Sequence, residues 1–177
     1  MYDRISLLEV YLMAIIGYKC FDKGLINKYG KKFSVGKIYI MPGAIKFGIN
    51  GNGFHMCKRI EDTFRYFECF ENEVDVCLVK GSGEVVEYSD DYYGYYDMYS
   101  VQKIEILKQL NREEIINEGL NMCDLRVKRF VSTFKLTEEE INLFRETFKD
   151  NLSVLDAIAY YQEGDEQAYE KKYKINK

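Results

Sequence analysis

The stretch GNGFHMC at residues 51–57, followed by IEDTFRYF at residues 60–67, decides how this chain folds. Its two glycines predict a turn, and the bulky residues from Phe54 onward predict a short strand. The apolar residues that follow at helical spacing predict a helix over residues 60–70. A strand that leads from a flexible turn into a helix N-terminus often forms part of a binding cleft. The one histidine of the chain, His55, lies in this stretch, so we expect the functional site here.

The segments on either side of this stretch have the patterns of strands and turns. We predict a first strand over residues 17–21. Residues 37–41 and 44–49 flank Pro42-Gly43, which predicts a hairpin. Further strands are predicted at residues 74–78, 84–88 and 101–107, with a turn at Gly81-Ser82-Gly83. The segment therefore predicts a mostly antiparallel sheet with one helix.

After residue 110 the apolar residues change to helical spacing. Residues 110–115 (LNREEI) and 136–141 (LTEEEI) each have a capping residue, a glutamate three positions on, and flanking apolar residues, which predicts two helix starts. A break is expected near Asp150-Asn151, and a helix end at Gly164. With a final polar helix through Tyr173, this predicts a region of three or four helices.

These patterns together predict an α+β fold in three parts. Residues 1–13 are an N-terminal extension, residues 14–110 form an α+β domain, and residues 111–177 form a helical region. Met13 directly precedes a strand-like start at residues 14–19, so we expect it to be an alternative or true start. The apolar run before it is too short to span a bilayer and contains Glu9, so no membrane association is expected.

Composition narrows the classes of function. The chain has 25 Lys+Arg, 29 Asp+Glu and a net charge of −4, which argues against nucleic-acid binding. Its five cysteines are odd in number and scattered, which favours reduced thiols in a cytoplasmic protein. A zinc site at His55, Cys57 and Cys69 would lack a fourth ligand, so we expect no metal.

The predicted strand and helix place several side chains near one another. Phe54 and His55 point to opposite faces of the strand. Thr63 lies in the first turn of the helix, and Tyr66 lies one turn further on the same side. A hydroxyl and an aromatic face can hold a planar amide-bearing ring such as nicotinamide. The alternative for His55 is a half-buried, hydrogen-bonded histidine without a ligand.

At these residues the chain resembles the ADP-ribosyltransferase superfamily. The poly-ADP-ribose polymerase branch has a strand of the form G-x-G-I-Y-F-A, followed by a serine that bonds the nicotinamide carboxamide and a tyrosine that stacks on the ring. Thr63 and Tyr66 stand at the same offsets, six and nine residues after Cys57, and His55 stands at the strand tyrosine. The resemblance implies an ADP-ribosyltransferase-like domain that binds NAD.

Two further motifs of that superfamily are poorly matched. The nearest counterpart of its first-strand motif is Tyr18-Lys19-Cys20, which adds Lys19 to the expected cofactor-binding residues. Gly94 stands where the catalytic glutamate would fall, and Glu84 and Glu87 are the remaining candidates for a catalytic role. The departures put transfer chemistry in doubt and imply a domain in which catalysis has been lost.

About half of the chain also resembles a family of uncharacterised small proteins associated with phages and prophages. The pattern of that family runs Y-K-x-F, V-G-K-x-Y, G-F-H-x-C and D-x-F-x-Y. The matching residues here are Tyr18–Phe21, Val35–Tyr39, Gly53–Cys57 and Asp62–Tyr66. This resemblance implies a phage-related setting.

A tyrosine-rich, acidic segment at residues 88–99 favours a different function. Tyrosines provide large and rigid contact surfaces, and the aspartates suit a basic target. We therefore expect a protein partner, bound through Tyr92, Tyr93, Tyr95 and Tyr96, unless these tyrosines pack on the sheet. The alternative to NAD binding is thus an inhibitor of a host factor, of the anti-defence or anti-CRISPR kind, and a regulatory module without a small ligand stays open.

Overall fold

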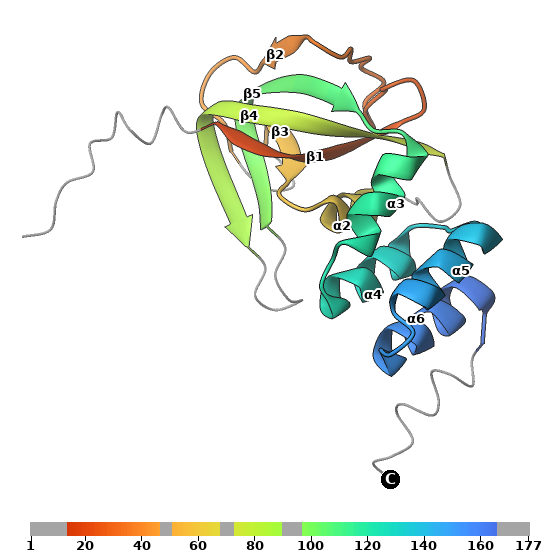
Figure 1. Ribbon diagram of the computed structural model, residues 1–177. Coiled ribbons are helices and arrows are strands. Elements are labelled where there is room, and N and C mark those ends of the chain that lie inside the picture. The colour runs from red at the N-terminus through yellow and green to blue at the C-terminus, as the bar shows by residue number, and fades with distance from the viewer. Residues whose placement is uncertain (1–13, 47–50, 68–72, 90–96, 166–177) are drawn as a thin grey trace, which may run out of the picture. The chain divides into compact units, whose positions relative to one another are not determined.

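The computed structural model describes residues 14–46, 51–67, 73–89 and 97–165 (Figure 1). These residues divide into two compact units, of which the first ends at Leu110 and the second begins at Asn111. The mixed α/β composition and the mostly antiparallel sheet predicted from the sequence are confirmed. The predicted extension at residues 1–13 and the predicted polar helix through Tyr173 lie outside the described residues.

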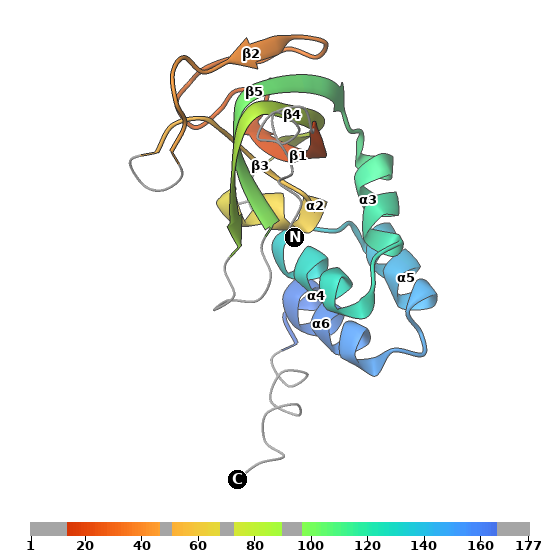
Figure 2. The same ribbon diagram turned by 90° about the vertical axis from the view of Figure 1, so that its left-hand side faces the viewer.

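The N-terminal unit is a small antiparallel barrel (Figures 1 and 2). Strand β5 pairs with β3, β3 with β1, β1 with β4, and β4 again with β5, so four strands close a ring. Strand β2 pairs with β5 alone and lies outside the ring. The strands are β1 (Ile15–Asp22), β2 (Ile38–Ile40), β3 (Phe54–Cys57), β4 (Val74–Ser89) and β5 (Asp97–Gln109).

The turn predicted at Gly81-Ser82-Gly83 is wrong, because these residues lie inside the long strand β4. The register of β4 against β5 shifts between Ser82 and Val85, and Gly83 adopts a φ of 80° at this irregularity. A bulge of this kind bends a strand without reversing it. The glycines therefore curve β4 around the barrel, and β4 makes its hairpin with β5 instead.

The hairpin predicted around Pro42-Gly43 is not formed by the described residues, and residues 47–49 of its predicted second strand lie outside them. Residues 38–40 pair with β5, where the Met41 amide donates to Gln102 O over 2.8 Å. Residues 44–46 form no strand, because Asn52 closes them into a loop. Its Oδ1 accepts from the Lys46 amide at 2.7 Å, and its Nδ2 donates to Ala44 O at 3.1 Å.

The barrel interior is an apolar cluster rich in aromatic rings. Phe33 contributes the central ring, 5.1 Å from Phe21, 4.5 Å from Tyr39 and 6.2 Å from Phe54 between ring centroids. The buried members of the cluster are Phe21, Leu25, Phe33, Phe54, Met56, Cys77, Val79, Tyr99, Val101, Ile104 and Ile106. Alternate residues of β3 and β5 thus face inward, as expected for a barrel.

The helix predicted after β3 is shorter than expected. Helix α2 (Ile60–Thr63) continues as a 3-10 turn at Phe64–Tyr66, and the backbone is extended again at Phe67. Ile60 and Phe64 are both fully buried, so the predicted apolar face is confirmed. The remaining predicted residues, 68–70, lie outside the described residues.

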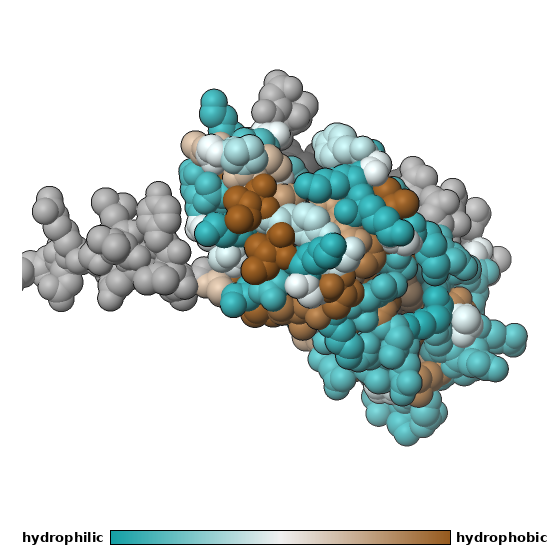
Figure 3. Space-filling model, turned by 90° about the horizontal axis from the view of Figure 1, so that it is seen from above, coloured by the Kyte–Doolittle hydropathy of each residue, from teal (hydrophilic) through white to brown (hydrophobic). Residues whose placement is uncertain are grey.

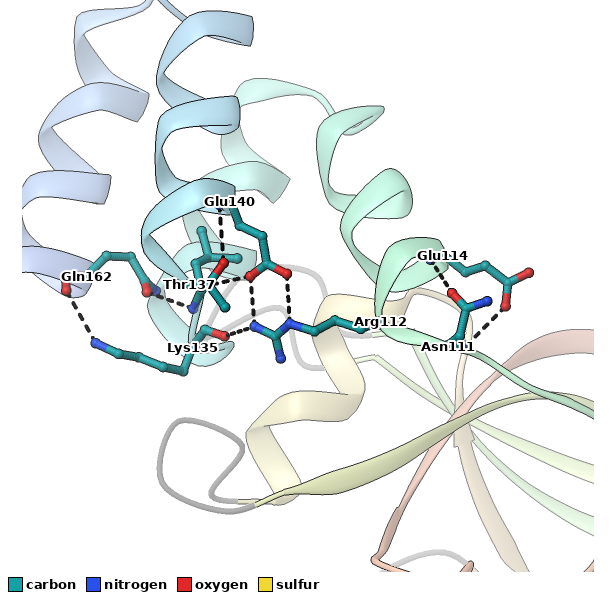
Figure 4. Close-up of polar contacts among 8 residues, drawn as sticks. Asn111, Arg112, Glu114, Lys135, Thr137, Glu140 and Gln162 are labelled. Carbon is teal, nitrogen blue, oxygen red and sulfur yellow. Dashed lines mark hydrogen bonds and ion pairs between the residues drawn. The ribbon is translucent and has the colours of Figure 1, made fainter.

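The C-terminal unit consists of α3 (Arg112–Leu120), α4 (Asp124–Thr133), α5 (Glu138–Thr147) and α6 (Leu152–Glu163). Both predicted capping boxes are confirmed, at Asn111 with Glu114 and at Thr137 with Glu140 (Figure 4). Asn151 caps α6, and Gly164 ends it in the left-handed conformation. Of the helices that the structure describes, none has the length and apolar content needed to cross a lipid bilayer.

A buried glutamine holds the helices of this unit together. The side chain of Gln162, on α6, donates to Phe134 O at 2.9 Å and accepts from the Leu136 amide at 3.0 Å. These contacts fasten the connection between α4 and α5 onto α6. Beside them, the rings of Phe130 and Phe144 stack with centroids 5.8 Å apart and an interplanar angle of 12°.

Candidate functional site

Strands β1 and β3 bring two of the predicted cofactor-binding residues together. They pair antiparallel with Tyr18 opposite Cys57, and Lys19 Nζ donates to the backbone oxygen of His55 over 2.6 Å. The contact involves the His55 backbone, while its side chain lies on the exposed outer face of the barrel. Partial burial of the imidazole, and then the positive charge of Lys19, lower the pKa of His55 below its ordinary value of 6.5, which favours the neutral ring at pH 7.

Lys19 points into the barrel. Side chains alternate along a strand, so Lys19 shares a face with Phe21, a member of the interior cluster. Its ammonium lies 5.5 Å from the centroid of the Phe21 ring. Burial lowers the pKa of Lys19 to about 8, although the neighbouring thiols of Cys57 and Cys20 act in the opposite direction. Within the described part of the chain, no carboxylate forms an ion pair with this lysine.

Thr63 lies on the other face of β1, in the core between the strand and α2. It is 3 % exposed, and its hydroxyl donates to Ile60 O at 2.7 Å and lies 3.0 Å from Cys20 Sγ. The hydroxyl therefore fastens the helix to β1 in this structure. The side chain of Tyr66 lies outside the described residues, so its part in the predicted nicotinamide cradle stays a prediction.

The cysteines near this corner are poor nucleophiles. Cys57 is buried beside the carboxylates of Asp62 and Glu61, which are each 1 % exposed. Burial, and then the charge of Asp62, raise the pKa of the Cys57 thiol to about 12. The thiol is therefore protonated at neutral pH, whereas a reactive cysteine needs a thiolate. Cys69 lies outside the described residues, so the three-residue zinc set considered above is untested.

The two candidate catalytic glutamates make local contacts on β4. Glu84 accepts from the Ile45 amide at 3.1 Å, and Glu87 accepts from the Tyr99 hydroxyl at 3.3 Å. Glu87 lies opposite Tyr99 on β5, and Tyr99 lies opposite Met56 on β3. Strand β5 thus lies between Glu87 and strand β3, which contains His55.

The free edge of β2 is a feature that sequence reasoning missed. Ile38 and Ile40 are 61 % and 60 % exposed, and Val35 before them is 48 % exposed. Seen from above, this side of the barrel shows apolar patches within a largely hydrophilic surface (Figure 3). The alternating triplet Ile-Tyr-Ile at residues 38–40 is typical of a strand, and it indicates the strand itself. It does not indicate that one edge of the strand is free, because a hairpin would cover that edge.

Hydrogen bonds at the ends of β2 show which backbone groups are directed outward. The Met41 amide donates to Gln102 O, and Lys37 O accepts from the Ile106 amide. Because bonding alternates along an antiparallel pair, the Lys37 carbonyl, the polar groups of Tyr39 and the Met41 amide are directed toward β5. The N–H and C=O groups of Ile38 and Ile40 consequently face the open edge.

The tyrosines predicted to bind a partner, Tyr92, Tyr93, Tyr95 and Tyr96, lie outside the described residues. In the described part of the chain, no group of three or more histidine, cysteine, aspartate or glutamate side chains is arranged to hold a metal ion. The β2 edge and the Lys19–His55 corner are two places in the described residues that allow a functional argument.

Comparison with known proteins gives one match. No curated protein and no solved structure matches the chain. Residues 15–118, which include all five strands of the described sheet and most of α3, match a family of domains. The chain accordingly belongs to the family described as Domain of unknown function (DUF7666).

Proposed function

We propose that this protein is a binding module that recognises a partner protein through the free edge of β2. The observation that carries the proposal is that Ile38 and Ile40 combine outward-facing backbone groups with side chains that are about three-fifths exposed. An extended segment of a partner can pair with such an edge and add a strand to the sheet. Its apolar side chains would cover the two isoleucines.

Exposed apolar side chains make this edge stand out. From Ser82 onward β4 also pairs on one side only, with β5, but within the described residues that edge carries Glu84 and Glu87 and no large exposed apolar side chain. Natural edge strands are commonly protected by charge or by a covering segment. Lys37 and Pro42 bound β2 and limit its length, yet the two isoleucines between them are uncovered in the described structure. Strand β2 has three residues, so backbone pairing with it would be short. Burial of the isoleucine side chains would then contribute to binding in addition to the backbone hydrogen bonds.

The sequence resemblances suggest what kind of partner this would be. In the predicted phage-related and cytoplasmic setting, the partner would be a host protein whose activity the module blocks. The acidic tyrosine-rich segment would add contacts to a basic surface. Inhibition by surface binding requires no catalytic residues, which agrees with the local roles of Glu84 and Glu87.

A capture experiment with the full-length chain tests this proposal. Tagged wild type would be incubated with lysate of cells in which the protein naturally occurs, cross-linked, and its partners identified by mass spectrometry. We expect Ile38→Lys/Ile40→Lys to lose the partner. Leu125→Lys, which alters a residue that is 55 % exposed on α4, should retain it. Equal capture by both variants would exclude the β2 edge as the binding surface.

A second candidate function is NAD binding without transfer chemistry at the corner formed by β1, β3 and α2. It is favoured by the 2.6 Å contact between Lys19 and the His55 backbone, which brings a cation to the strand that resembles the nicotinamide-binding strand. A titration of the full chain with NAD and with nicotinamide, followed by calorimetry and melting temperature, tests it. Millimolar ligand that leaves both wild type and Tyr66→Ala unchanged would exclude this function.

A further inference from the structure

Three aromatic rings at one end of the barrel surround a single ammonium group. Lys31 Nζ lies 5.5 Å from the ring centroid of Phe33, 5.2 Å from that of Tyr39 and 5.6 Å from that of Phe54. The rings are not parallel, since Phe33 makes angles of 50° with Tyr39 and 89° with Phe54. Their faces therefore converge on the charge from several directions. We call these three rings the aromatic cage.

The framework of the barrel holds the aromatic cage in place independently of Lys31. Phe54 belongs to β3 and pairs with Val101, while Tyr39 belongs to β2 and pairs with Ile104. The amide of Phe33 donates to Leu25 O over 2.8 Å, which fixes the backbone at the third ring, and the Phe33 ring packs on Phe21. Phe33 and Phe54 are 1 % and 6 % exposed with Lys31 in place, so removal of the Lys31 side chain would uncover rings whose positions do not depend on it.

The occupant, in contrast, is attached to a surface turn. Asn27 Oδ1 accepts from the amides of Tyr29 and Lys31, and Gly30 takes a φ of 77° in this turn. These bonds fix the backbone of the turn but not the Lys31 side chain, which is exposed. Within the described part of the chain, no carboxylate forms an ion pair with Lys31. Within these residues the ammonium of Lys31 makes cation–π contacts alone, so it can move out into solvent without breaking a hydrogen bond or an ion pair.

Lys28 and Lys19 provide a comparison, because each lies near one aromatic ring. Lys28 Nζ lies 5.0 Å from the ring of Phe67, and Lys19 Nζ lies 5.5 Å from the ring of Phe21. A single contact of this kind is common wherever lysines lie near aromatic residues. Three rings around one ammonium form a more specific arrangement, and this is the geometry with which proteins recognise quaternary ammonium ligands.

We propose that the aromatic cage is a binding site for a methylated ammonium group, and that Lys31 is an intramolecular occupant which the ligand displaces. A primary ammonium is strongly hydrated and loses that water when aromatic walls enclose it. A trimethylammonium group keeps the positive charge, has no N–H groups to hydrate, and presents methyl groups to the rings. It should thus occupy the same position more favourably than Lys31 does.

Choline and its uncharged analogue 3,3-dimethylbutan-1-ol test the proposal, because they have the same shape and differ in charge. Binding to the full chain would be followed by NMR through the ring resonances of Tyr39 and Phe54. We expect choline to bind Lys31→Ala at least several-fold more tightly than wild type, because the competing occupant is gone. Lys28→Ala, the matched control, should bind like wild type, and the uncharged analogue should bind no variant measurably.

Two further variants and a second ligand complete the test. Lys31→Gln, which retains most of the stem but no charge, serves if Lys31→Ala does not give a folded spectrum. Tyr39→Leu should lose at least most of the choline affinity in the Lys31→Ala background. Nε-trimethyllysine, compared with choline, distinguishes a modified protein side chain from a small molecule as the source of the group. A folded Lys31 variant that binds choline no better than wild type, or no better than the uncharged analogue, overturns the proposal.

Discussion

Arg112, at the start of α3, binds Glu140, in the first turn of α5, through two parallel hydrogen bonds. Nε to Oε1 and Nη2 to Oε2 are both 2.7 Å, and the same guanidinium donates to Lys135 O at 2.8 Å (Figure 4). Glu140 also completes the capping box of α5. One carboxylate thus serves both the start of its own helix and the attachment of another.

This double role predicts an acid-dependent loss of stability. Burial alone would raise the pKa of Glu140, but hydrogen bonds from Arg112 and Thr137 outweigh it and lower the pKa. A carboxyl with a lowered pKa stabilises the fold above its unfolded pKa, and this contribution disappears as the pH falls through the folded pKa. We expect Arg112→Met to cost about 1 kcal/mol at pH 7 and little at pH 3, by urea unfolding.

Lys149→Met is the control for this prediction, because Lys149 pairs only with the exposed Glu146 one turn away. Its effect should be within about 0.5 kcal/mol at both pH values. An effect of Arg112→Met that is equal at pH 7 and pH 3 would contradict the role assigned to the ion pair.

Lys19 leads to a prediction in the alkaline pH range. Its pKa is about 8 in the fold against 10.5 in the unfolded chain, so the fold disfavours its charged form. Below pH 8 the buried charge of Lys19 lowers the free energy of unfolding by its full amount. Between pH 8 and 10.5 the unfolded chain binds more protons than the folded chain, so wild-type stability rises with pH. Lys19→Met should therefore stabilise the protein by about 1–3 kcal/mol at pH 7.

The advantage of Lys19→Met should shrink as the pH is raised from 8 toward 10.5. Lys37→Met, at an exposed position before β2, provides the comparison and should show no such trend. Denaturant unfolding at four pH values measures both. A destabilised Lys19→Met variant would show that the hydrogen bond to His55 O outweighs the burial of the charge.

Thiol labelling distinguishes the cysteines by their surroundings. Burial, and then the charge of Asp75, raise the pKa of Cys77 to about 12. The pKa of Cys57 is also raised to about 12. Cys123, in contrast, is exposed. At pH 8 we expect rapid alkylation of Cys123, with Cys57 and Cys77 labelled at the rate of unfolding. Peptide mass spectrometry over time measures these rates, and labelling in urea should remove the difference. Fast labelling of Cys57 in the native protein would contradict its burial.

Gly17 and Gly81 lie where neighbouring strands approach closely, so alanine substitution at either position should lower stability. A Cβ at Gly17 would lie 2.3 Å from the Cys57 backbone oxygen, whereas a Cβ at Gly81 would lie 2.7 Å from Met56 Sδ and Val101 Cγ1. Side chains can shift but a paired backbone cannot, so Gly17→Ala should destabilise more than Gly81→Ala, for which we expect about 1–3 kcal/mol. Thermal unfolding compares them with Ser82→Ala, which should be nearly neutral. The reverse order would show that β1 and β3 can separate at this point.

The local parts of the fold were predictable from the sequence. Capping boxes depend on residues three positions apart, and both were found at Asn111 and Thr137. Helix α4 was not identified individually, because its first residue follows Cys123, which makes no side-chain capping bond. Signals that act over three or four residues can be read in a sequence, and helices that depend on packing alone give weaker ones.

Barrel closure was not predictable in the same way. Glycines at residues 81–83 have the composition of a turn, and only the pairing of β4 with β5 on one side and β1 on the other shows that they bend a continuous strand. The aromatic cage likewise combines residues 31, 33, 39 and 54, whose approach depends on β2 joining β5. Of the candidate site, the sequence indicated Lys19 and His55 as candidates, but not that Lys19 on β1 faces the barrel interior while the His55 side chain on β3 faces outward.

The position of β5 in the barrel has a consequence for how the chain folds as it is synthesised. This strand pairs with β2, β3 and β4, yet it is the last of the five to leave the ribosome. Until Gln109 has emerged, β2 has no partner, β3 lacks its longer pairing, and the apolar interior stays open to water. Folding of the first unit must therefore wait for nearly all of its residues, which makes it slower and more dependent on distant contacts than the helical unit that follows.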